Sequence, residues 1–161
     1  MAGRLAGKTA VVVGAGQTPG ETIGNGRATA ILFAREGAVV LCVDRRLDSA
    51  ADTVAMIEAE GGRASAYEAD ITDEAACQAL AAEAKARLGR IDILHNNVGV
   101  GGRDNSLTQL EGEVFDRIMT TNLKAMWLTI KHFLPLMREQ DRKSTRLNSS
   151  HQGTSRMPSS A

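Results

Sequence analysis

The sequence lacks an excess of charge, a long hydrophobic run and a cysteine cluster, and each absence excludes a class of protein. Nineteen basic residues balance nineteen acidic ones, and residues 1–140 carry 15 basic and 18 acidic residues. This balance argues against nucleic acid as a partner. No apolar run approaches the roughly 20 residues that span a bilayer, and residues 1–10 contain no apolar signal core. We therefore expect a cytoplasmic protein that does not bind membranes.

Cysteine is scarce as well. Cys42 and Cys77 lack the spacing of a metal-binding motif, so we expect no metal site. Cys42 lies within an apolar run, which favours a buried core thiol.

Short apolar runs alternate with segments of helical spacing along most of the chain. The expected strands cover residues 8–13, 38–43, 63–69 and 91–95. The expected helices cover residues 27–36, 49–60 and 73–88, with a long helix from residue 115 that Pro135 should kink or end. Strands that are apolar throughout imply a parallel sheet covered by helices on both faces. Right-handed crossovers then predict an α/β, doubly wound, Rossmann-like fold.

The segment GAGQTPGETIGNG, residues 14–26, joins the first expected strand to the first expected helix. A glycine-rich turn in this position lets backbone N–H groups and the helix N-terminus bind a pyrophosphate. The alternative is a flexible surface loop.

Asp44 ends the second expected strand. A carboxylate there can accept both ribose hydroxyls of an adenosine, and it can also cap the next helix. A 2′-phosphate about 4 Å away would be repelled by about 4 kcal/mol at an effective dielectric constant near 20. This favours NAD over NADP, although NADP remains open because Arg45 and Arg46 could screen part of the repulsion.

Four motifs in residues 3–140 together resemble the short-chain dehydrogenase/reductase family. They are the glycine motif, the acidic motif ADITD, the NNVG segment and the helical segment TTNL. The resemblance implies a cofactor site made of Gly14, Gly16, Ile23, Gly24, Gly26, Asp44, Asp70, Ile71, Asn96, Val98 and Gly99.

The resemblance also implies that Asn122 is a catalytic residue, because the family's helix asparagine helps to hold a water in a proton relay. Asn122 is expected on a buried helix face beside Met119 and Leu123. A buried amide needs partners, so a structural asparagine satisfied by backbone groups is the alternative.

The sequence departs from the family pattern in three places. Val13 replaces a threonine, Val98 replaces an alanine, and the glycine loop is about six residues longer than usual. Closing 11 rather than five intervening residues costs only about 0.7 kcal/mol of chain entropy, so the long loop is compatible with binding.

The family's general acid/base, a tyrosine followed four residues later by a lysine, is missing from this sequence. The one tyrosine is Tyr67, and residue 71 is isoleucine.

We expect the full-length parent to be an NAD(P)-dependent oxidoreductase of alcohols or ketones, similar to 3-oxoacyl-carrier-protein reductases that act on acyl thioesters. Its expected assembly is a homodimer or homotetramer, and the present chain should be inactive. A non-catalytic dinucleotide-binding or sensor protein is the alternative, and the NNVG and TTNL motifs disfavour an S-adenosylmethionine-dependent methyltransferase.

Residues 141–161 differ from the rest of the chain, since they contain six of its nine serines. Their sequence resembles the translation of a common sequencing-library adapter. We interpret them as a non-native tail, and residues 1–140 as a truncated NAD(P)-binding Rossmann domain. In the family order 3-2-1-4, the fourth expected strand would then be an exposed edge, and we expect the chain to be marginally stable or insoluble.

Overall fold

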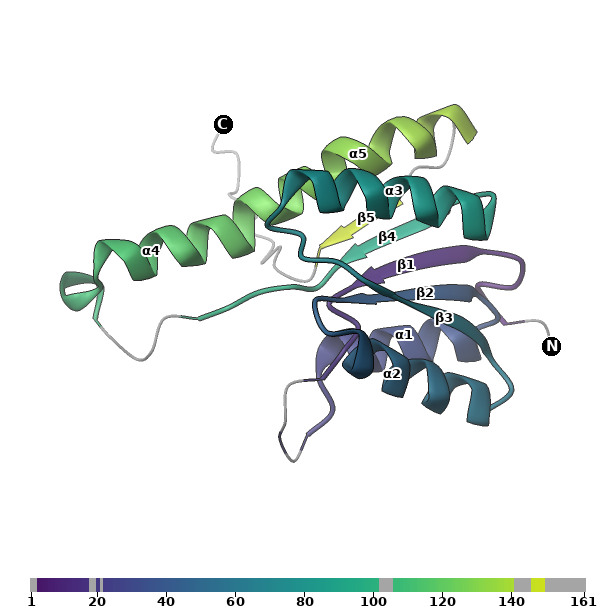
Figure 1. The fold of residues 1–161 in the computed structure, drawn as a ribbon. Coiled ribbons are helices and arrows are strands. Elements are labelled where there is room, and N and C mark those ends of the chain that lie inside the picture. The colour runs from purple at the N-terminus through teal and green to yellow at the C-terminus, as the bar shows by residue number, and fades with distance from the viewer. Residues whose placement is uncertain (1–2, 18–19, 21, 102–105, 141–145, 150–161) are drawn as a thin grey trace, which may run out of the picture.

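A parallel five-stranded sheet in the order β3-β2-β1-β4-β5 organises the computed structural model (Figure 1). The structure describes residues 3–17, 20, 22–101, 106–140 and 146–149. The strands are β1 (Thr9–Val13), β2 (Val39–Asp44), β3 (Arg63–Glu68), β4 (Ile93–Asn96) and β5 (Arg146–Ser149). The helices are α1 (Asn25–Arg35), α2 (Leu47–Ala59), α3 (Glu74–Leu88), the 3-10 turn η1 (Leu107–Gln109), α4 (Gly112–Met119), the π turn η2 (Thr120–Lys124) and α5 (Ala125–Gln140).

Helices cover both faces of the sheet, with α1 and α2 on one face and α3 and α5 on the other (Figure 1). The central strands explain this arrangement because their side chains alternate between two buried clusters. Val11 and Leu41 belong to the cluster on the α3/α5 face, whereas Val12 and Cys42 belong to the cluster on the α1/α2 face. All four side chains are fully buried. The predicted order 3-2-1-4 and the Rossmann-like class are confirmed.

The expectation that β4 forms an exposed edge is wrong. Residues 146–149 pair with it in parallel as β5, from Ile93 opposite Arg146 to Asn96 opposite Ser149. An edge strand presents a row of unpaired backbone N–H and C=O groups, and any nearby extended segment can satisfy them. The tail therefore contributes a strand even though its composition is unlike that of the other four.

The predicted long helix is divided into α4, the π turn η2 and α5. Pro135 does not end it, since α5 continues to Gln140. The side chains that α5 buries against the sheet are Ala125, Leu128, Thr129, Phe133 and Met137.

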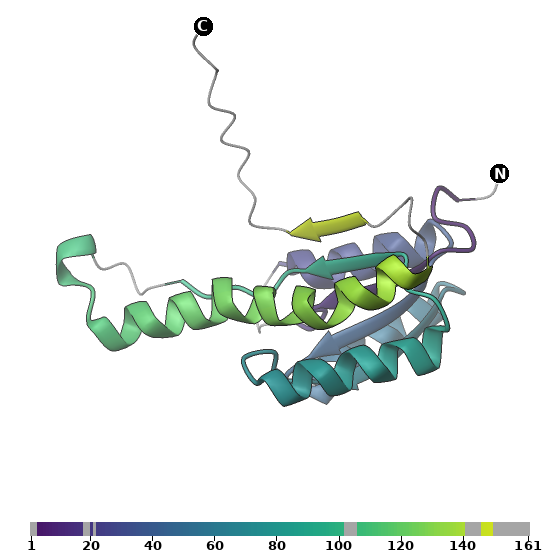
Figure 2. The same ribbon diagram turned by 90° about the horizontal axis from the view of Figure 1, so that it is seen from above.

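The expected burial of the first half of this helix is wrong. Phe115, Met119, Leu123 and Trp127 are between 39% and 53% exposed. Figure 2 shows the reason, because α4 runs beyond the end of the sheet, where no strand lies beneath it. Among the described residues, no helix is long and apolar enough to cross a membrane.

Candidate cofactor-binding site

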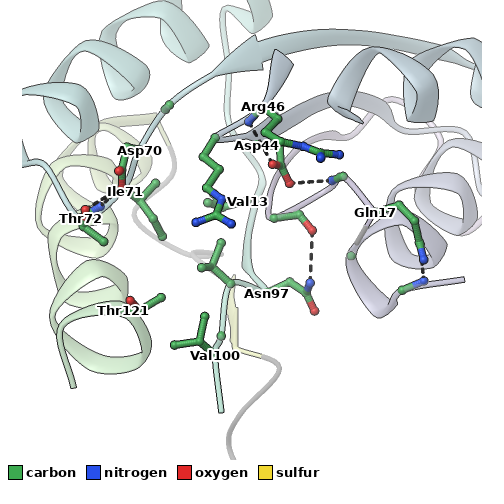
Figure 3. A pocket seen from close by; sticks show the side chains of 18 of the residues that line it. Val13, Gln17, Asp44, Arg46, Asp70, Ile71, Thr72, Asn97, Val100 and Thr121 are labelled. Carbon is green, nitrogen blue, oxygen red and sulfur yellow. Dashed lines mark hydrogen bonds between the residues drawn. The ribbon is translucent and has the colours of Figure 1, made fainter. Parts of the chain in front are cut away.

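A cavity of about 990 Å³ lies at the carboxyl ends of the first four strands (Figure 3). Its wall combines the loop after β1, the ends of β2 and β3, the segment after β4, and the α4–η2 helix. Parallel α/β sheets bind ligands at this edge because loops from neighbouring strands converge there. The size also suits a cofactor or another organic ligand.

The loop after β1 brings the backbone of the first strand close to helix α1. Gly14 has a φ of +80°, a conformation that favours glycine. A β-carbon on Gly26 would overlap the carbonyl oxygen of Gly14, so α1 can begin here only with a glycine at position 26. The first N–H groups of a helix have no intrahelical partner, and those of α1 begin at Gly24, which lines the cavity. The arrangement gives a positively polarised backbone surface for an anion.

Asp44 stands beside this turn at the end of β2. Its Oδ2 accepts a hydrogen bond from the Gly16 N–H at 3.0 Å, and its Oδ1 accepts one from the Arg46 N–H at 3.1 Å. A β-carbon on Gly16 would lie 2.5 Å from both the Asp44 Oδ2 and the Ser49 Oγ, so a larger residue here would displace these side-chain groups. The N-cap residue of α2 is Arg46, so Asp44 holds the cap backbone without itself being the cap.

Asp70 and Ile71 follow β3, next to the end of β2, on the side of the cavity away from Gln17 (Figure 3). The Asp70 Oδ1 accepts hydrogen bonds from the Thr72 hydroxyl at 2.7 Å and the Thr72 N–H at 2.9 Å. These bonds, together with the charge of Arg45, hold the pKa of Asp70 below its usual value. The carboxylate is therefore ionised at neutral pH and fixed in orientation.

The two asparagines after β4 have separate roles. The Asn96 side chain is buried on the α5 side, where its Oδ1 accepts from the Thr129 hydroxyl at 2.9 Å. Asn97 faces the glycine turn, and its Nδ2 donates to the Gly14 carbonyl at 3.2 Å. Val98 packs closely over Gly14, whose added β-carbon would lie 2.9 Å from the Val98 Cγ2. This segment therefore joins the glycine turn to α5.

Asn122 lies in the π turn, and its side chain bonds to both backbone groups of Val100. The residue is half-buried and does not line the cavity. This geometry matches the alternative of a structural asparagine satisfied by backbone groups. A part in a proton relay stays a prediction.

The structure brings most of the predicted cofactor residues together. Those that line the cavity are Gly14, Gly16, Gly24, Gly26, Asp44, Asp70, Ile71, Val98 and Gly99. Ile23 does not line it and is 55% exposed, and Asn96 points into the core.

Sequence reasoning missed several lining residues, which are Gln17, Arg45, Arg46, Thr72, Asp116, Arg117, Thr120 and Thr121. In the sequence, Arg45 and Arg46 suggest only charges that could screen the repulsion between Asp44 and a 2′-phosphate. The four residues of α4 and η2 carry no such signal in the sequence, because their approach to the cavity depends on where the long helix lies beyond the carboxyl ends of the strands (Figure 2).

The chain is similar to many known oxidoreductases. The family model for short chain dehydrogenases matches residues 8–160. An uncharacterized oxidoreductase, YxbG of Bacillus subtilis, is 39% identical over 137 residues, which cover 85% of this chain and 48% of that protein.

Two solved structures share the fold. A 7α-hydroxysteroid dehydrogenase complexed with NADH and 7-oxo glycochenodeoxycholic acid is 36% identical, with a TM-score of 0.76 over 85% of this chain and 51% of that one. A metagenomic short-chain oxidoreductase in complex with NADP is 31% identical, with a TM-score of 0.79 over 90% of this chain and 62% of that one. The chain thus spans about half the length of the curated relatives it matches. On the match of its sequence and its fold, the chain belongs to the short-chain dehydrogenase/reductase family.

Proposed function

We propose that the cavity binds a nicotinamide dinucleotide, with NAD preferred over NADP. One observation carries this proposal: the Asp44 carboxylate lies on the cavity wall directly beside the glycine turn, with its Oδ2 3.0 Å from the Gly16 nitrogen. A pyrophosphate bound by the turn would place the adjacent ribose within reach of this carboxylate. A 2′-phosphate on that ribose would meet its negative charge.

The residues on the wall fit such a group. The N–H groups that follow Gly24 in the first turn of α1 would hold the pyrophosphate, and Gly14 would let it approach the backbone closely. Asp44 would accept the ribose hydroxyls, and Ile71 would pack against the adenine, beside the ionised carboxylate of Asp70. When bound, the nicotinamide supplies the carbon that accepts or donates a hydride.

For the whole protein we propose hydride transfer between the nicotinamide and an alcohol or ketone. The similarity to an enzyme solved with a keto steroid supports a carbonyl substrate. An acyl thioester, as in 3-oxoacyl-carrier-protein reductases, belongs to the same chemical class. The proposed parent is a cytoplasmic homodimer or homotetramer.

The 161-residue chain itself is proposed to bind the cofactor without turnover. Its one tyrosine, Tyr67, lies in β3, and the residue four positions later is Ile71, so the family's general acid/base is missing from this sequence. We also treat residues 141–161 as a non-native tail. A second candidate, a non-catalytic dinucleotide-binding protein, is favoured by the same missing tyrosine. A long read of the source locus across codon 140 separates the two, because only the dehydrogenase continues into Tyr-x-x-x-Lys.

The cofactor proposal is tested by thermal denaturation of the chain with NADH, NADPH or S-adenosylmethionine. We expect NADH to raise the melting temperature most. Asp44→Ala should remove the preference for NADH over NADPH, whereas Glu58→Ala, an exposed change of the same charge on α2, should preserve it. Stabilisation by S-adenosylmethionine alone would contradict the proposal.

A further inference from the structure

The side chain of Gln17 bridges the two ends of the extended glycine loop. Its Nε2 donates to the Thr22 carbonyl at 2.7 Å, and its Oε1 accepts from the Gly24 N–H at 2.6 Å. The amide of Gln17, labelled in Figure 3, is thus bonded to the backbone both at Thr22 and at Gly24.

The backbone of Gln17 is fixed independently of its side chain. Its N–H donates to the Ser49 hydroxyl at 2.7 Å, and the same hydroxyl lies 3.2 Å from the Gln17 carbonyl oxygen, to which it donates. Ser49 is buried in the first turn of α2 and is only 3% exposed. The backbone of Gln17 is therefore bonded to α2, and its side chain is bonded to the N-cap of α1, so Gln17 connects the starts of the two helices.

The contact with Gly24 matters because Gly24 is the N-cap of α1 and has no side-chain cap of its own. Its N–H is already bonded to Gln17, so the N–H groups that remain for an anion are the following ones in the first turn. Gly24, Asn25 and Gly26 all line the cavity. Holding Gly24 therefore sets where these N–H groups point.

We propose that Gln17 is a positioning residue that holds Thr22 and Gly24 in place, so that the first turn of α1 is aligned to bind a pyrophosphate. The inference rests on the proposed function of the site as a dinucleotide site. An amide is required chemically, because the side chain must donate to one backbone group and accept from another. A carboxylate could accept from Gly24 but could not donate to Thr22, and its charge would repel the phosphates.

The test compares two ligands by ligand-observed NMR titration of the full chain. ADP-ribose contains the pyrophosphate, whereas adenosine contains only the part that would contact Asp44 and Ile71. Gln17→Met keeps the volume of the side chain but removes the hydrogen bonds to Thr22 and Gly24, so the Kd for ADP-ribose should rise about tenfold. Gln17→Glu should raise it further, and the Kd for adenosine should not change in either variant.

Gln78→Ala, at an exposed position on α3, is the matched control and should leave both Kd values unchanged. Equal weakening of both ligands by Gln17→Met, or no weakening of either, would overturn the inference. If the wild-type chain fails to bind ADP-ribose, both the proposed function and this inference are wrong. If the wild-type chain binds ADP-ribose and Gln17→Met binds it equally well, the inference about Gln17 is wrong and the proposed function stands.

Amide hydrogen exchange gives a second test that needs no variant to fold. The Gly24 N–H should exchange slowly in the wild-type chain because Gln17 accepts its hydrogen bond. Exchange at the rate of an open loop would overturn the inference.

Discussion

The side-chain amide of Asn122 is hydrogen-bonded to both backbone groups of Val100, accepting from the N–H at 2.7 Å and donating to the carbonyl at 2.8 Å. The amide thus makes the two hydrogen bonds to Val100 that the backbone of a neighbouring strand would make in a sheet. The other end of β4 is held in the same way, since the Gln140 amide accepts from the Ile91 N–H at 2.9 Å and donates to the Ile91 carbonyl at 3.1 Å. Two amides therefore fix the long helix to the two ends of one strand.

Substitution of Asn122 should destabilise the chain. In Asn122→Ala the half-buried N–H and carbonyl of Val100 lose their partners, so the free energy of unfolding should fall by about 1–2 kcal/mol. Asn122→Asp should also be destabilising, because a carboxylate then faces the Val100 carbonyl oxygen. Urea denaturation followed by circular dichroism measures the change, with Gln78→Ala as the control. An unchanged midpoint for Asn122→Ala would show that the hydrogen bonds between Asn122 and Val100 do not stabilise the chain.

Gly26 should tolerate no side chain. Its added β-carbon would overlap the Gly14 carbonyl oxygen, so Gly26→Ala must push α1 away from the turn, at a cost of about 3 kcal/mol or more. Gly112→Ala is the matched control at the start of α4, where an added β-carbon meets nothing within 4 Å. It should be neutral or stabilise by up to about 1 kcal/mol. The comparison uses the unfolding midpoints of both variants. Equal midpoints would show that Gly26 does not lie as close to the Gly14 carbonyl oxygen as the structure places it.

His95 should make stability depend on pH. Its ring packs edge-on against Phe33, and within the described part of the chain its buried Nε2 has no hydrogen-bond partner. Burial lowers the pKa of His95 below the ordinary value of 6.5. Between the lowered pKa and 6.5 the unfolded chain binds more protons than the folded chain. Stability should therefore fall as pH drops through about 6.5 and stop falling below the folded pKa.

The variant His95→Phe isolates this effect. It keeps an aromatic ring beside Phe33 but cannot be protonated, so its free energy of unfolding should change less between pH 7 and pH 5 than that of the wild type. Denaturation curves at several pH values measure the two slopes. Identical slopes would mean that His95 is not buried in its neutral form.

Both cysteines should be unreactive in the folded chain. Burial raises the pKa of the Cys42 thiol to about 12 and that of the Cys77 thiol to about 11, so the reactive thiolate is very rare at pH 8. A colorimetric thiol reagent should label neither cysteine within minutes under native conditions, and both after unfolding. Rapid labelling in the native state would show that the sheet is open.

Removal of β5 should promote aggregation. A chain ending at residue 140 leaves the outer edge of β4 without a partner, including the buried Ile93 and Leu94, whereas a chain ending at residue 149 keeps it paired. Light scattering over time should rise faster for the shorter chain. Equal scattering would indicate that β5 does not protect this edge in solution.

The local pattern of the sequence determined the α/β class, the order of the first four strands and the glycine turn beside Asp44. These features depend on short-range physical chemistry: apolar periodicity, β-branched runs and glycines that permit close approach. The three-dimensional structure alone decided that Gln17 is bonded to Thr22 and Gly24, that Asn122 is bonded to Val100, and that Thr121 reaches the cavity. It also paired residues 146–149 with β4, and it left Phe115 and Leu123 exposed beyond the sheet. The patterns of apolar residues and glycines do not encode these features, because most of them depend on how the sheet and its helices pack.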